Sequence, residues 1–407
     1  MKAFNIRQFC IDHWQVICLY GLLFLTLFIT LTFKLHSLLP GFNIAEVQTY
    51  QSSKSLAYIF HHPVNAPYLI LGWLVLSAHS AQPLFYLRTA SIALGLGIAA
   101  IFCGLLYYWH GHRIALLGTL LFTTSGIFLH SARFGAPDIL IFGLLMLIAC
   151  GVWLQATASP YAMVLLLILS AGLMYIPGMP WIIGLCILIN WQRLDGFFSK
   201  QLPIVSIGAL VAICMLIPLG WDVYQTPSIV KTLLNLPANG WPRLLPTLRH
   251  IVGVPIHVFA YGQGGSVFML GHLPVLNAFE AAMFLFGAYL YVRHFKLYRF
   301  KVLTALLIAS CIIVSLGGPT NISLLAPILF LIVSAGIDYL LEQWFRVFPR
   351  NPLARAIGMS CMTALVLLVF AYNLRVYFVS WSNANSTKAN FMLADVGSLE
   401  TFDTIGR

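Results

Sequence analysis

Charged residues are scarce in this sequence. Only 8% of its 407 residues are Asp, Glu, Lys or Arg, whereas 60% are hydrophobic. A soluble chain of this length would need far more charge to cover its surface. The composition therefore excludes a soluble enzyme and predicts a polytopic membrane protein.

Sequence motifs for binding a metal ion or a cofactor are also absent. The eight cysteines include no Cys-x-x-Cys pair, and all but Cys10 lie within apolar runs. That pattern is typical of small buried residues, not of a disulfide or zinc framework. The sequence has no metal-ligand motif and no glycine-rich dinucleotide or phosphate loop. We therefore expect neither a metal nor a cofactor.

Long basic tracts are missing as well. The net charge is +11, but the 22 Lys and Arg residues are spread among loops. Membrane topology and anionic headgroups explain this charge, so we expect membrane lipids and no nucleic acid as partners. The first apolar run is long enough to span a membrane, and no small-residue cleavage site follows it, which argues against a cleaved signal peptide.

Eleven apolar runs have about the length that crosses a bilayer. They predict an all-α transmembrane domain over residues 1–380. The short run at 178–191 begins between Pro177 and Pro180 and is the weakest, and residues 249–270 could be a structured loop or a partial insertion. The runs are 15–33, 84–108, 114–130, 137–155, 161–176, 178–191, 203–220, 274–292, 301–317, 322–341 and 356–379.

The distribution of positive charge predicts the orientation. With the N-terminus inside, the short inner segments hold 12 of the 22 Lys and Arg residues, and 293–301 (RHFKLYRFK) is the clearest inner loop. We expect a multi-pass protein of the plasma membrane, most simply the inner membrane of a bacterium, with a cytoplasmic N-terminus. Asp338, near an inner helix end, is expected to pair with an inner Arg.

Three longer segments then lie on the outer side. In the first outer loop, 34–83, a weakly amphipathic stretch precedes the thirteen-residue run 67–79, which as a helix would measure about 20 Å. These stretches predict interfacial helices. The second large outer loop, 221–273, is rich in Trp, Pro, Arg and His. The outer tail, 381–407, is too short to bury a core of its own.

Several features follow one another in the first half. An acidic loop motif (IAEVQTY) precedes a His/Pro turn with an apolar helix (HHPVNAPYLILGWL). Next come an Arg at the start of a spanning helix (LRTASIALGLG) and a helix pair joined by SARFGAPD. In this order, residues 15–155 resemble the GT-C superfamily of lipid-linked-sugar glycosyltransferases. The resemblance is to the family 39-like group, which includes protein O-mannosyltransferases and bacterial aminoarabinose transferases.

The resemblance implies a GT-C-like bundle of about 11 transmembrane helices with its active site on the outer face. It implies transfer of a sugar from a polyprenyl-phosphate donor to an acceptor hydroxyl, with inversion. Such a reaction builds negative charge on the leaving phosphate, which cationic side chains stabilise. The acceptor hydroxyl must lose a proton, so a carboxylate base is expected.

Glu46 is the predicted base. Members of the family have an Asp-Glu pair in the first outer loop, whereas this chain has Ala45-Glu46. Glu46 could therefore have taken over the catalytic role, or the protein could use another carboxylate. The alternative is that Glu46 only caps the first helix of the loop, because acidic residues favour helix starts.

Seven further residues are predicted to bind substrate. Arg88 is a candidate phosphate ligand that could otherwise be a snorkelling Arg at a helix end. Arg133 and Asp138 could pair with each other, or Asp138 could cap the helix after Pro137. The remaining candidates are His61, His62, Arg249 and His250. His61 and His62 could instead be interfacial bystanders.

Two other functions fit the composition. A transporter or flippase would use Glu280, because an ionisable residue within a transmembrane helix is a functional candidate. A catalytically degenerate GT-C scaffold would bind a lipid-linked sugar without turnover. Dependence on Glu280 and on an ion gradient would distinguish the transporter from the enzyme.

Overall fold

We describe a computed structural model of the chain over residues 6–78, 83–198, 202–237, 240–262 and 270–391. These residues form helices and connecting turns with no β-strand among them, in agreement with the predicted all-α class. The helices are α1 (Ile6–Thr32), α2 (Ile44–Ser52), α3 (Leu56–His61), α4 (Ala66–Ala78), α5 (Pro83–His110), α6 (His112–Thr124), α7 (Gly126–Arg133), η1 (Pro137–Phe142), α8 (Gly143–Thr157), α9 (Pro160–Leu173), α10 (Met179–Phe198), α11 (Leu202–Gln225), α12 (Ile229–Leu233), α13 (Leu244–Phe259), α14 (Ala278–Arg293), α15 (Tyr298–Ser315), η2 (Ile322–Leu325), α16 (Ala326–Val347), α17 (Pro352–Arg375), η3 (Val376–Trp381) and α18 (Asn385–Asn390).

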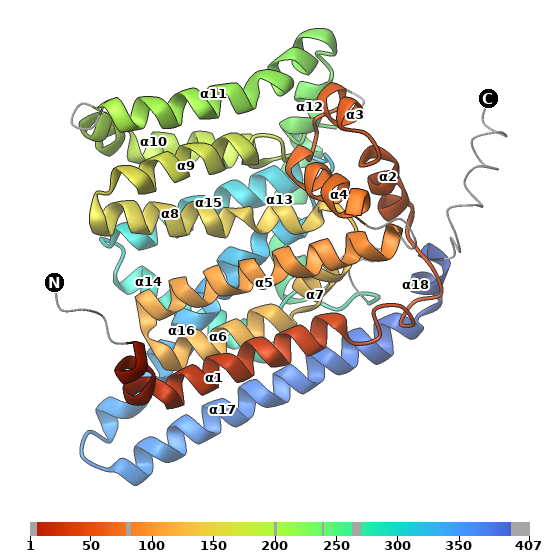
Figure 1. The fold of residues 1–407 in the computed structure, drawn as a ribbon. Coiled ribbons are helices and arrows are strands. Elements are labelled where there is room, and N and C mark those ends of the chain that lie inside the picture. Colours follow the sequence, from red (N-terminus) through yellow and green to blue (C-terminus); the bar gives the residue numbers. More distant parts are fainter. Residues whose placement is uncertain (1–5, 79–82, 199–201, 238–239, 263–269, 392–407) are drawn as a thin grey trace.

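The long helices run side by side, and their connections gather at two opposite ends (Figure 1). We call one the Glu46 end, which carries α2, α3, α4, α12 and α18 on the right of Figure 1. The other is the basic end, on the left, which carries the connections α5–α6, α8–α9, α14–α15 and α16–α17. A bundle of this kind satisfies its backbone hydrogen bonds within each helix, as a bilayer requires.

Each of the eleven predicted runs coincides with a helix or a pair of helices. Seven helices in the described residues are long and apolar enough to cross a membrane, or eight if the bent pair α6–α7 counts as one span. The helices α9 and α10 are shorter apolar helices. The protein is thus a multi-pass membrane protein, while the count of eleven spans stays a prediction.

The loop predictions are met in part. The first loop forms three helices, and α4 covers the run expected at the interface almost residue for residue. In the second loop, α13 covers the first part of the ambiguous stretch 249–270, whereas 263–269 lie outside the described residues. Of the tail 381–407, residues 392–407 also lie outside them.

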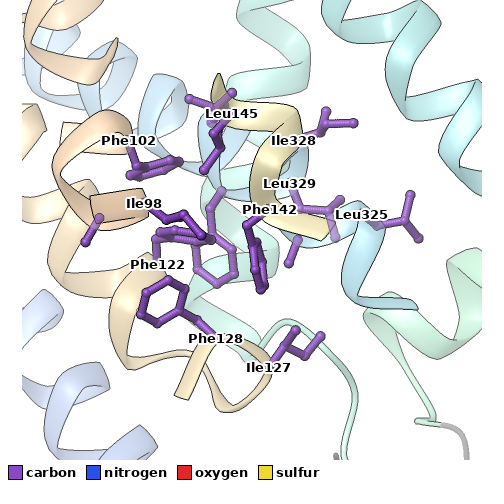
Figure 2. Close-up of a cluster of buried hydrophobic side chains, with 14 of the residues drawn as sticks. Ile98, Phe102, Phe122, Ile127, Phe128, Phe142, Leu145, Leu325, Ile328 and Leu329 are labelled. Carbon is purple, nitrogen blue, oxygen red and sulfur yellow. The ribbon is translucent and has the colours of Figure 1, made fainter. Parts of the chain in front are cut away.

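A cluster of aromatic rings fills the centre of the bundle around the break between α6 and α7 (Figure 2). Phe102 and Phe122 stack with ring centroids 4.3 Å apart, and Phe142 meets Phe122 edge-on at 5.8 Å. Ser125 has an extended backbone, and its hydroxyl donates to the Phe122 carbonyl and accepts from the Phe128 N–H. The chain bends there by 67°. The helix α7 therefore leaves the direction of α6 before it ends at Arg133.

The helices α14 and α16 pack with almost no space between their backbones. A Cβ on Gly287 would lie 2.0 Å from the Ile332 carbonyl oxygen, and one on Gly336 would lie 1.9 Å from that of Met283. Small residues that let backbones approach are typical of helix pairs in membranes.

Asp338 lies on α16 toward the basic end and pairs with a histidine. Its Oδ2 lies 2.6 Å from Nδ1 of His110, at the end of α5. The predicted pairing of Asp338 with an inner Arg is therefore wrong, because α16 packs against α5 and brings a histidine to the carboxylate first.

Candidate functional site

Glu46 lies in the first turn of α2 and closes a capping box with Asn43. The Asn43 N–H donates to Glu46 Oε2 at 3.1 Å, while the Asn43 side chain accepts from the Ala45 N–H at 3.0 Å. This reciprocal arrangement satisfies backbone N–H groups that an α-helix start leaves without partners. The capping role considered for Glu46 is therefore real, and it is combined with a second role.

The second role is a buried ion pair with Arg88. Nε of Arg88 donates to Glu46 Oε1 at 2.7 Å, and Nη2 donates to Oε2 at 2.8 Å. Arg88 also donates to the carbonyls of Leu35 and Gly41, each at 3.2 Å. Glu46 has no exposed surface, and Arg88 is 5% exposed. Such a bidentate pair is the geometry in which Arg–carboxylate hydrogen bonds are strongest.

Gly135 supplies the fourth donor to Glu46. Its N–H lies 3.0 Å from Oε1, and a Cβ at this position would come within 3.0 Å of Leu87 Cβ. Both Glu46 oxygens thus accept two N–H groups each. A carboxylate has about four lone-pair sites, and all are occupied here.

A hydroxyl chain runs beside this cluster. The Tyr68 hydroxyl, from α4, donates to the Leu87 carbonyl at 3.1 Å and lies 2.6 Å from Ser91 Oγ, which donates to the Phe134 carbonyl. Burial raises the pKa of Tyr68, and the carboxylates of Glu46 and Asp138 act in the same direction. Both acids therefore lie near one tyrosine hydroxyl.

Arg133 pins the end of α1 to α7. Its Nη1 and Nη2 donate at 2.7 Å to the carbonyls of Thr30 and Phe33, which belong to the last turn of α1 and the residue after it. Carbonyls at a helix end have no partner within the helix, so the guanidinium satisfies groups that burial would otherwise leave unpaired. The rings of Tyr377 and Phe378 cover it at 5.5 and 4.8 Å.

Asp138 lies in the first turn of η1, directly after Pro137. It is half-buried, and its carboxylate makes no hydrogen bond or ion pair with any residue of the described ranges. The pairing of Arg133 with Asp138 that the sequence left open is wrong, because Arg133 turns toward α1. Asp138 keeps its lone pairs available.

The other predicted binding residues have exposed side chains. His61 and His62 end α3 with exposed side chains, and the His62 ring packs on Tyr58 at 4.7 Å. Arg249 and His250 are exposed on α13. No hydrogen bond or ion pair within the described residues joins these four to Glu46, Arg88, Arg133 or Asp138.

Glu280 lines a cavity of about 490 Å³ at the start of α14. Its Oε2 accepts the Asn277 N–H at 3.1 Å in another capping box, and its Oε1 accepts from Asn373 Nδ2 at 3.3 Å. Tyr372, Tyr377 and Trp381 also line this cavity. The buried acid in α14 thus has a structural explanation that the sequence did not provide.

Sequence reasoning missed Tyr68, Ser91 and Gly135. None has a local signature, since Tyr68 and Ser91 lie within apolar helices and Gly135 within a short connection. Their contacts with Glu46, Leu87 and Phe134 appear only when α2, α4, α5 and the connection after α7 meet.

The fold is similar to solved structures of ArnT from Cupriavidus metallidurans, an aminoarabinose transferase of the GT-C superfamily. The TM-score is 0.54 with the apo structure and 0.50 with the one bound to undecaprenyl phosphate. Each match covers 93% of this chain and 77% of the ArnT chain at 14% sequence identity. No family model and no curated protein sequence matches the chain. The likeness establishes a GT-C-type fold.

Proposed function

We propose that this protein is a membrane glycosyltransferase that moves a sugar from a polyprenyl-phosphate donor to an acceptor hydroxyl. The observation that carries the proposal is the GT-C-type fold over 93% of the chain, shared with ArnT structures of which one holds undecaprenyl phosphate. A second support is the cluster of carboxylates and guanidinium groups at one end of the bundle, where such a donor would present its phosphate.

We assign Glu46 a positioning role and Asp138 the role of base. The sequence predicted Glu46 as the base, but four N–H donors occupy its lone pairs. Asp138 accepts no hydrogen bond from the described residues, so an acceptor hydroxyl could donate to it. A base must lie within hydrogen-bond reach of the proton that it takes.

The leaving phosphate needs cations that are not already saturated. Arg88 uses four of its five N–H groups, two on Glu46 and one each on the carbonyls of Leu35 and Gly41. Arg133 is held by two carbonyls. These two groups contribute fixed positive charge, while the exposed Arg249 and His250 are suited to direct phosphate contact.

The proposed reaction takes place on the outer face of the plasma membrane. With the N-terminus in the cytoplasm, the basic end faces inward and the Glu46 end outward, which follows the positive-inside rule. A lipid-linked donor would then enter sideways from the outer leaflet. Direct displacement by the acceptor hydroxyl would invert the anomeric carbon.

The test is donor turnover. Purified protein is given radiolabelled polyprenyl-phosphate sugars carrying mannose, hexosamine or pentose, with a membrane extract as the source of acceptor. We expect wild type to release polyprenyl phosphate from at least one donor. Asp138→Asn should lower the rate by about 10²- to 10⁴-fold while donor binding persists, because general-base catalysis contributes an effect of that size.

Glu342→Gln is the matched control, because Glu342 forms an exposed pair with Arg346 at the basic end. It should leave turnover unchanged. If Glu46→Gln abolishes turnover in folded protein while Asp138→Asn does not, Glu46 is the base. Donor binding by wild type without release would identify a degenerate scaffold, and the absence of both would reject the transferase.

A further inference from the structure

A second cavity of about 490 Å³ lies toward the basic end, between α5, α8, α9, α10 and α15. Most of its wall is aliphatic, including Leu147, Ile148, Val302 and Leu306. Gly151, on α8, also lines it, and a Cβ built on this glycine would meet nothing within 4 Å. The cavity therefore has room and apolar surface for hydrocarbon.

The polar end of the cavity is formed by α10 and the first turn of α15. Tyr298 donates to the Asn190 side-chain oxygen, and Asn190 in turn donates to the Cys186 carbonyl at 2.8 Å. Tyr108 and Trp109 complete this rim from the end of α5. Aromatic and amide groups around the mouth of an apolar cavity match the boundary between acyl chains and headgroups.

Arg299 stands at this rim without a protein anion. It is half-buried and makes no hydrogen bond or ion pair with a described residue. The Trp109 and Tyr291 rings flank its guanidinium at 5.2 and 5.5 Å. Asp338, an acid at the same end, is already paired with His110. A guanidinium held in place by two rings retains its donors for a ligand oxygen.

We propose that this cavity binds an anionic phospholipid, with one acyl chain among α5, α8, α10 and α15 and its phosphate on Arg299. The neighbouring residues Arg293, Lys296 and Lys301 make the segment strongly basic. Basic pockets between transmembrane helices are suited to anionic headgroups. The site is at the opposite end from Glu46 and does not depend on the proposed transfer. The acyl chain would fill the cavity and so contact the helices on both sides of it.

The test measures lipid retention on the purified full-length chain. Detergent-solubilised protein is stripped of lipid and titrated with micelles containing phosphatidylglycerol or phosphatidylcholine, and bound lipid is counted by native mass spectrometry. We expect tight binding of about one phosphatidylglycerol and weaker binding of phosphatidylcholine. Arg299→Gln should weaken phosphatidylglycerol binding about fivefold.

Two pairs of matched variants test whether lipid binding depends on this cavity. Lys296→Gln removes the same charge from an exposed position of the same segment and should have a smaller effect than Arg299→Gln. Gly151→Leu should fill the cavity and abolish tight binding, whereas Gly104→Leu, on α5 where a Cβ also meets nothing within 4 Å, should not. Equal binding of both lipids, or binding insensitive to Arg299→Gln and Gly151→Leu, would overturn the proposal.

Discussion

At the residue scale, the Glu46 and Arg88 side chains bond to each other and to backbone groups of the surrounding chain. Taking two charges out of water is costly, and the pair persists because every hydrogen-bonding site on the carboxylate is used. Its donors come from α2, α5 and the connection after α7. The pair therefore fixes the geometry of the Glu46 end around Tyr68 and Asp138.

Removing one partner of this pair should be strongly destabilising. Arg88→Ala leaves a buried, uncompensated carboxylate, and we expect a loss of about 3–5 kcal/mol. Arg346→Ala, which breaks the exposed pair with Glu342, should cost about 0–1 kcal/mol. Thermal and denaturant unfolding in detergent would measure both. Similar small effects for the two variants would show that the buried pair is not structural.

Gly135→Ala should also destabilise the protein. The new methyl group would lie 3.0 Å from Leu87 Cβ and 3.4 Å from Glu46 Oε1. Overpacking of this kind outweighs the smaller entropic gain of replacing glycine, so we expect a net loss of about 1–2 kcal/mol. Gly97→Ala, on α5 with nothing within 4 Å, should be neutral or slightly stabilising in the same unfolding assay.

At the element scale, the contact between α14 and α16 determines how the second half packs. Gly287 and Gly336 each face the partner's backbone, and α16 is buried along most of its length. The start of α14 holds Glu280 and Asn277, whose capping box orients the cavity beside Tyr377. The position of that cavity thus depends on two glycines near the middle of the helices.

Gly336→Ala should force α14 and α16 apart. Its Cβ would lie 1.9 Å from the Met283 carbonyl oxygen, a backbone atom that cannot rotate away. We expect a loss of about 3 kcal/mol, at the upper end of overpacking, visible as a lower midpoint of thermal unfolding. Gly21→Ala, on the open face of α1, is the control and should not lower it. An unchanged midpoint for Gly336→Ala would rule out this close contact.

At the scale of the whole molecule, the two ends differ in chemistry. The Glu46 end carries the short interfacial-type helices (Figure 1). It also holds the buried Glu46–Arg88 pair and the hydroxyl chain of Tyr68 and Ser91. The basic end carries the cationic turn between α14 and α15. The positive-inside rule then predicts that the basic end faces the cytoplasm and the Glu46 end faces the outer side.

Thiol labelling tests this orientation. Cysteine introduced at the exposed Lys54 should react with a membrane-impermeant maleimide added to intact cells, above the signal of the native cysteines. Cysteine introduced at the exposed Lys296 should react only after the membrane is permeabilised. The reverse pattern would place the Glu46 end in the cytoplasm, and labelling of both from outside would refute a spanning bundle.

The sequence by itself determined the class of the protein and the position of its helices along the chain. Hydropathy is a local property, and a bilayer admits only helices or closed barrels, so apolar runs predict helices without knowledge of their neighbours. The order of motifs in residues 15–155 indicated the GT-C-type fold that the ArnT structures share. It also placed Glu46, Arg88 and Arg133 at one end.

Only the tertiary structure decided which polar groups meet. Glu46 and Arg88 are 42 residues apart, and Arg133 reaches a carbonyl 103 residues away. Such pairs depend on how each helix is rotated and on the bend at Ser125, which hydropathy does not encode. For the same reason the sequence left open a pairing of Arg133 with nearby Asp138, and nothing in it indicated that Gly135 would complete the hydrogen bonds of Glu46. Helix packing determines these partners, because it decides which buried donors and acceptors come within hydrogen-bond distance of one another.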